Sequence, residues 1–162
     1  MELRILQAQW VLELIRAEDV HVAATKLLEA GVELPAVVRL AGMIDAGYFE
    51  VEPVLRQAFT EGGLPPLDER AARWRLAYDA ARQIVAAEVS PLEGATTLWH
   101  LCNQLGMPKP LRYFVYLAAD YGEGPGDRET EAAWFDGRIR ETARELLAIA
   151  PSLGESPPPD AE

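Results

Sequence analysis

The chain has 162 residues, of which 49% are apolar and 25% charged, the composition of one globular domain or of two very small ones packed together. This composition excludes collagen-like, disulfide-rich and wholly disordered proteins. The 26 acidic residues outnumber the 15 Lys and Arg residues and leave a formal net charge of -11. Because binding to phosphate backbones or anionic lipids requires a basic surface, we expect neither nucleic acid nor a membrane as partner.

The only cysteine, Cys102, cannot form an intramolecular disulfide, which favours a reducing cytoplasm. The N-terminus lacks the charged-then-apolar layout of a signal peptide, and no apolar run approaches the roughly 20 residues that span a bilayer. The 13 Arg against 2 Lys, together with 25 Ala, are typical of a GC-rich bacterial genome. We therefore expect a cytoplasmic bacterial protein.

Apolar residues recur at spacings of three and four along nearly the whole chain, which predicts an all-α protein, a compact bundle of about eight helices. The first helix is expected from Glu2 to Ala17, in a central position. Its apolar residues are Leu3, Ile5, Leu6, Trp10, Leu12, Leu14 and Ile15. Asp19 is the expected N-cap of a second helix that ends at Gly31. A single helix over residues 2–30 is the alternative, because neither Gly nor Pro interrupts them.

The third helix is expected to open at Leu34-Pro35 and to end within residues 42–47. The fourth is expected from Val51 to Glu61. Its inward side chains would be Val51, Val54, Leu55, Ala58 and Phe59. The Gly- and Pro-rich residues 62–66 then mark a subdomain boundary. They separate an N-terminal half, 1–62, from a C-terminal half, 63–150, and we expect the two halves to pack as one domain.

Four further helices are expected in the C-terminal half, with helix-start signals at Asp68 and at the capping box Ser90-Pro91-Leu92-Glu93. Their expected ranges are 68–88, 91–106, 111–121 and 128–150. The last would place Phe135, Ile139, Thr142, Leu146 and Ile149 at core spacing. Residues 151–162 hold four prolines and three acids, so a disordered acidic tail is expected.

No metal site, cofactor or catalytic residue emerges from the sequence. His100 and Cys102 are two residues apart, so on a helix they point in different directions and cannot chelate one ion. His21 has no ligand partner at helical spacing. Cys102 is therefore interpreted as a small core residue.

The acidic, glycine-rich stretch from Asp120 to Glu131 is the candidate contact site for a partner, because long glycine-rich loops on helical scaffolds often carry function. The candidate residues are Asp120, Tyr121, Glu123, Asp127, Glu129, Glu131 and Trp134. A plain exposed connector between helices is the alternative. Tyr113, Tyr116 and Trp134 share their helix faces with charged residues, so they belong either to the core or to an aromatic and acidic surface patch.

The segment from Ala80 to Leu147 resembles small helical bacterial proteins of uncharacterised function. The resemblance is carried by Ser90-Pro91-Leu92-Glu93-Gly94-Ala95, Trp99, the helix end Leu117-Ala118-Ala119-Asp120 and the acidic stretch after it. It implies a helical fold and brings no catalytic residues. Some small acidic helical bacterial proteins are immunity proteins that block a basic toxin, an analogy of size and charge.

The sequence thus favours a non-enzymatic module that binds a basic protein partner, such as an immunity-type inhibitor of a toxin or regulator. Two alternatives remain: an enzyme with converging carboxylates in a cleft between helices, and a purely structural helical domain. The acidic excess lies at the two ends of the chain. Residues 1–66 hold 10 acids and 5 bases, whereas residues 111–162 hold 11 acids and 5 bases.

Overall fold

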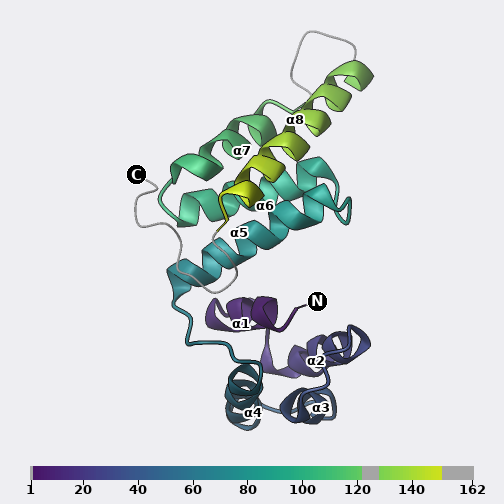
Figure 1. Cartoon of the computed structure of the whole chain (residues 1–162), viewed down its shortest axis with the longest axis vertical. Coiled ribbons are helices and arrows are strands. Elements are labelled where there is room, and N and C mark those ends of the chain that lie inside the picture. Colours follow the sequence, from purple (N-terminus) through teal and green to yellow (C-terminus); the bar gives the residue numbers. More distant parts are fainter. Residues whose placement is uncertain (1, 122–127, 151–162) are drawn as a thin grey trace. The chain divides into compact units, whose positions relative to one another are not determined.

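The computed structural model describes residues 2–121 and 128–150, and this part of the chain folds into helices without a strand (Figure 1). The helices are α1 (Leu3–Val11), η1 (Ala17–Asp19, a short 3-10 helix), α2 (Val20–Glu29), α3 (Pro35–Ala41), α4 (Tyr48–Glu61), α5 (Glu69–Val85), α6 (Pro91–Gln104), α7 (Lys109–Ala119) and α8 (Arg128–Ala148). The prediction of an all-α protein with about eight helices is confirmed. The expected disordered tail lies outside the described residues. No described helix combines the length and apolar character that crossing a membrane requires.

The chain divides into two compact units, unit 1 up to Ala72 and unit 2 from Arg73 onward. Each has a hydrophobic core of its own. The boundary falls within the first turns of α5, ten residues after the expected limit at residue 62. The packing of the two halves as one domain stays a prediction.

The core of unit 1 is built from α1, α2, α3 and α4, with α3 packed against α2 and against α4 (Figure 1). The side chains expected to point inward from α4 are all buried, which confirms them: Val51, Val54, Leu55, Ala58 and Phe59. Their spacing of three and four residues places them on one stripe of the helix, and this stripe joins α4 to the rest of the unit.

The first helix is shorter than expected, because α1 ends at Val11 and not at Ala17. Glu13 adopts a left-handed backbone with φ of 55°, and its N–H donates to the carbonyl of Trp10. The N–H of Leu14 donates to the carbonyl of Gln9 at 2.8 Å. These two bonds form a Schellman motif, which closes the helix and turns the chain away. Leu14 is consequently 65% exposed, so its expected place in the core was wrong. Residues 2–30 thus form separate helices.

The start of α2 and of α4 also differ in detail from expectation. Asp19 stands at the N-cap position of α2, but its side chain makes no capping hydrogen bond. Gly31 has φ of 85° just past the end of α2, as expected. In α4, the Gly47 N–H donates to Glu50 Oε2 at 3.0 Å, which starts the helix at Tyr48 and not at Val51. Tyr48 and the next residue, Phe49, therefore lie in the first turn of α4.

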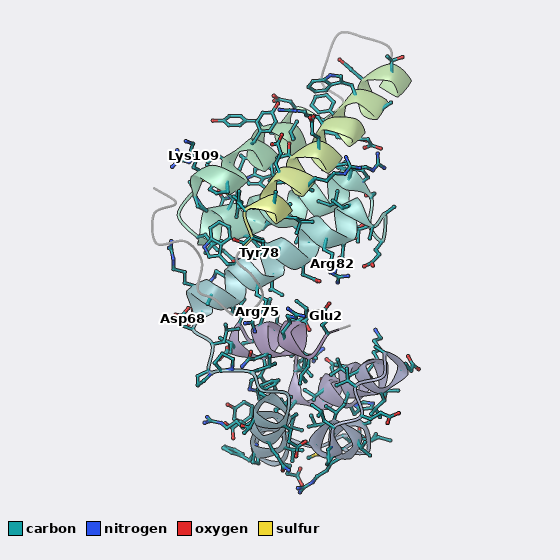
Figure 2. The ribbon with its side chains drawn as sticks, viewed as in Figure 1. Glu2, Asp68, Arg75, Tyr78, Arg82 and Lys109 are labelled. Atoms are coloured by element: carbon teal, nitrogen blue, oxygen red, sulfur yellow. The ribbon has the colours of Figure 1, made fainter. Side chains whose placement is uncertain are left out.

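Unit 2 has a core formed by side chains of α5, α6, α7 and α8. Asp68 lies at the start of α5 (Figure 2), and its carboxylate accepts a hydrogen bond from the N–H of Ala71 at 2.7 Å, as a capping residue does. The Ser90 hydroxyl accepts from the N–H of Glu93 at 3.2 Å and caps α6. A Cβ atom at Gly94 would overlap the side chain of Ile84, so this glycine permits the close approach of α5 and α6.

All four helices of unit 2 end two or three residues before their expected ends, with α6 ending at Gln104 and α7 at Ala119. The end of α5 is Val85 and not Glu88, because Ala87 has φ of 57° and the Glu88 N–H donates to the carbonyl of Gln83. The end of α8 is Ala148, so Ile149 follows the helix and is exposed, against its expected place in the core. Cys102 is buried as expected, and burial raises the pKa of its thiol.

Candidate functional site

The candidate site lies on the neighbouring helices α7 and α8, which run side by side in unit 2 (Figure 1). On α7, Tyr113 and Tyr116 are three residues apart and therefore share one face of the helix. On α8, Trp134 and Arg138 are four residues apart and share a face in the same way. The contact between Tyr113 and Arg138 joins the two faces. We call these four residues the α7–α8 face.

The three rings of the α7–α8 face are solvent-exposed. Tyr116 is 60% exposed, Trp134 is 58% exposed and Tyr113 is 39% exposed. Their neighbours on the same helices, such as Phe114 and Leu117, are buried instead. Of the two interpretations that the sequence left open for these rings, the structure therefore favours a surface patch over the core.

Arg138 connects the two helices of the α7–α8 face. Its guanidinium carbon lies 5.2 Å from the centre of the Tyr113 ring, and its Nε donates to the Tyr113 hydroxyl at 3.4 Å. Its Nη1 donates to Glu141 at 2.5 Å and forms an ion pair with it. Hydrogen bonds to Tyr113 and to Glu141 raise the pKa of Arg138. The guanidinium thus presents a fixed positive charge and holds a ring of α7 against α8.

Tyr121 contacts the α7–α8 face through Phe135, which packs against Trp134. Its hydroxyl donates to Asp136 at 2.9 Å, and its ring centre is 5.5 Å from that of Phe135. Phe135 in turn meets Trp134 edge-on at 5.0 Å. Burial, then the hydrogen bond to Asp136, raise the pKa of Tyr121. Tyr121 therefore supports Trp134 through Phe135, and its hydroxyl already has a hydrogen-bond partner within the protein.

The candidate acidic residues are only partly covered by the structure. Asp120 is the exposed C-cap of α7, four residues after Tyr116, and Glu131 lies three residues before Trp134 on α8. This spacing places both acids beside the rings. The Oε2 atom of Glu131 is shielded from solvent and has no hydrogen-bond partner in the described part of the chain.

The remaining candidate acids cannot be placed on this surface. Glu123 and Asp127 lie outside the described residues, and Glu129 is placed only as part of the helical backbone of α8. The structure thus brings Asp120, Glu131 and Trp134 to one surface.

Sequence reasoning named every ring of the α7–α8 face but missed the contact between Arg138 and Tyr113. The spacing of Arg138, four residues after Trp134, was the available signal, because it places the guanidinium beside the indole on α8. Its meeting with Tyr113 depends on the packing of α7 against α8, which no local pattern encodes.

The histidines make local contacts. His21 Nδ1 lies 2.7 Å from the carbonyl oxygen of Glu18, and the His100 ring stacks on Trp99 with centres 6.1 Å apart. Over residues 2–121 and 128–150, no group of three or more His, Cys, Asp or Glu side chains is placed to hold a metal ion.

Compared with known proteins, the chain matches no protein-family model, no curated protein and no solved structure. The roles of its residues therefore follow from the geometry of the α7–α8 face and from the charge around it.

Proposed function

We propose that this protein is a non-enzymatic binding module that contacts a basic protein partner through the α7–α8 face. The observation that carries the proposal is the exposure of Tyr113, Tyr116 and Trp134 on two adjoining helices, beside an ordered Arg138. Tyr, Trp and Arg are the residue types that dominate the binding energy of protein interfaces. An exposed cluster of them has no stabilising role in the core of unit 2.

The charge around the face supports a basic partner. Asp120 and Glu131 flank the rings, and residues 111–162 carry 11 acids against 5 bases. Such a field speeds the encounter with a positively charged protein, while the rings supply most of the affinity. The exposed carboxylate of Asp120 would accept a hydrogen bond from a Lys or Arg of the partner. An immunity-type inhibitor of a basic toxin or regulator would bind in this way.

The proposal is tested with the full chain as bait in extracts of the cells that express it. The bait is used as wild type, as the double variant Tyr116→Ser/Trp134→Ser, and as Val38→Ser. Val38 is an exposed apolar residue of unit 1 and serves as the matched control. A captured protein is then purified, and its dissociation constant is measured by calorimetry at low and at physiological salt.

We expect the double variant to bind the purified partner at least about 30-fold more weakly, because the loss of one hot-spot ring alone costs roughly 2 kcal/mol or more. We expect Val38→Ser to bind like the wild type and added salt to weaken binding. A partner that binds the double variant as tightly as the wild type, or binds with no dependence on salt, would overturn the proposal.

A further inference from the structure

Unit 1 contains a groove of about 840 Å³ that the sequence did not predict. One wall is the second half of α1 with the residues that follow it, and the other is one face of α4 with the residues after its end. The lining residues are Gln7, Trp10, Val11, Glu13, Ile15, Arg16, Ala17, Tyr48, Glu52, Arg56, Phe59, Thr60, Leu64, Pro66 and Leu67. All of them belong to unit 1, so the groove is complete within one compact unit.

A row of three aromatic rings leads from this groove to the surface. Trp10 and Tyr48 stack with ring centres 5.3 Å apart and planes 13° apart, and Tyr48 meets Phe49 edge-on at 5.7 Å. Tyr48 is 56% exposed and Phe49 is 91% exposed. A phenylalanine in that position contributes almost nothing to the core, so its apolar surface is available to a partner. We call Trp10, Tyr48 and Phe49 the aromatic row.

The shape of the groove fits a helix. Tyr48, Glu52, Arg56 and Thr60 follow one another at intervals of four along α4, so the wall extends over about 18 Å of helix axis. A segment that docks between helices must satisfy its own backbone groups, since the described part of unit 1 offers no strand edge to pair with. A helix does so internally and buries an apolar stripe in such a groove.

The negative charge beside the groove comes from the small hollow that adjoins it, since the lining of the groove alone has two acids and two arginines. The groove and the small hollow beside it are lined by four acids and two arginines: Glu13, Glu18, Asp45, Glu52, Arg16 and Arg56. Both arginines already pair within unit 1, Arg16 with Glu18 at 2.8 Å and Arg56 with Glu52. The lining therefore has an excess of negative charge that its own arginines do not balance, which complements Lys and Arg side chains on the rim of a docked helix.

From these contacts we propose that the groove and the aromatic row of unit 1 form a docking site for a basic amphipathic helix of another protein. Apolar side chains of that helix enter the groove and cover Tyr48 and Phe49. Its Lys and Arg side chains face Glu13 and the acids of the adjoining hollow. This site shares no residue with the α7–α8 face and does not depend on the function proposed for that face.

The test uses two synthetic peptides of about 14 residues with the same helical pattern of Leu, one with Lys and the other with Glu at the remaining positions. Each is titrated into the full-length protein, and binding is followed by NMR. The four Trp residues provide indole resonances, so that Trp10 reports on the groove and Trp134 on the α7–α8 face. The protein variants are Phe49→Ser, Tyr48→Ser/Phe49→Ser and, as the matched control, Val38→Ser at an exposed apolar residue of unit 1 outside the groove. Trp134→Ser is added to distinguish the two surfaces.

We expect the Leu/Lys peptide to shift the Trp10 indole, and the Leu/Glu peptide to leave it unchanged. Binding should weaken at least tenfold in Tyr48→Ser/Phe49→Ser and remain unchanged in Val38→Ser. Phe49→Ser alone, at a side chain almost free of internal contacts, should retain the fold and weaken binding severalfold. Equal binding of both peptides, shifts confined to Trp134, or affinity unaffected by Phe49→Ser would each overturn the proposal.

The experiments distinguish the failure of one proposal from the failure of the other. Loss of the natural partner in Tyr116→Ser/Trp134→Ser, with retained peptide binding in Trp134→Ser, supports both sites. Loss of peptide binding in Trp134→Ser would assign the basic helix to the α7–α8 face and overturn the groove proposal alone.

Discussion

The aromatic row of unit 1 and the α7–α8 face of unit 2 both expose aromatic rings, but the rings are supported in different ways. Trp10 is half-buried, packs against the core of unit 1 and stacks on Tyr48. Trp134 is exposed and meets Phe135 edge-on, while Tyr113 is held by the guanidinium of Arg138. The aromatic row therefore continues the hydrophobic core of unit 1, whereas the rings of the α7–α8 face lie outside the core of unit 2.

This difference indicates which kind of contact each surface makes. A row of rings beside a groove accepts an inserted segment, because the segment displaces water from the groove and covers the rings. A pair of helices that presents rings and one arginine accepts a complementary outer surface. The difference in support also predicts that removal of a ring should lower the free energy of unfolding in unit 1 and the affinity for a partner in unit 2.

The largest expected effect is on Trp10. Trp10→Ala removes a half-buried indole from the core of unit 1 and its stack with Tyr48, so we expect a loss of about 2 to 3 kcal/mol in the free energy of unfolding. Trp134→Ala removes an exposed ring and should change that free energy by about 0.5 kcal/mol or less. Urea denaturation followed by circular dichroism measures both. Equal losses in the two variants would contradict the distinction between the surfaces.

A smaller effect is expected at Tyr121, which links the α7–α8 face to the core of unit 2. Tyr121→Phe keeps the ring contact with Phe135 but removes the hydrogen bond to Asp136, so we expect a loss of about 1 kcal/mol. Tyr116→Phe, at an exposed ring, is the control and should be neutral.

The pH dependence follows from the raised pKa of Tyr121. Folding stabilises the neutral phenol, so its contribution is complete below the ordinary tyrosine pKa of about 10 and is lost as the pH rises through the higher pKa of the folded state. The stability difference between wild type and Tyr121→Phe should therefore narrow only in strongly alkaline buffer. A difference that narrows between neutral pH and pH of about 9 would instead implicate another group.

Helix ends show how far the sequence predicts this fold. Gly31, Gly63 and Gly106 adopt left-handed backbones just past α2, α4 and α6, and those three helix ends were expected at or beside a glycine. Glu13 and Ala87 adopt the same conformation after α1 and α5, and these two helices were expected to run six and three residues further. A glycine marks such an end in the sequence, whereas a glutamate or alanine gives no such signal.

The candidate sites, like the helix ends, were predicted where a local sequence signal was recognised. The rings of the α7–α8 face were identified because Tyr113, Tyr116 and Trp134 share their faces with charged residues, a local property. The aromatic row was missed because α4 was expected to begin at Val51, which left Tyr48 and Phe49 in a loop. Gly47 and Glu50, three residues apart, carried the signal of the earlier start.

The smallest expected effect, and the one that should be alike in the two units, comes from the two strained helix ends. Glu13 in unit 1 and Ala87 in unit 2 each place an L-residue in the left-handed region, which costs about 1 kcal/mol relative to glycine. Part of the gain from a glycine is offset by the greater freedom of the unfolded chain.

We therefore expect Ala87→Gly and Glu13→Gly to raise the free energy of unfolding by about 0.5 to 1 kcal/mol each. Ala86→Gly, one residue before the left-handed position, is the matched control and should lower it, since Ala86 lacks a positive φ. Chemical denaturation of the three variants measures these changes. A gain at Ala87 but a loss at Glu13 would show that the Glu13 side chain, which lines the groove, stabilises unit 1 more than its backbone strains it. The two units would then also differ in how the side chain at a left-handed helix end affects stability.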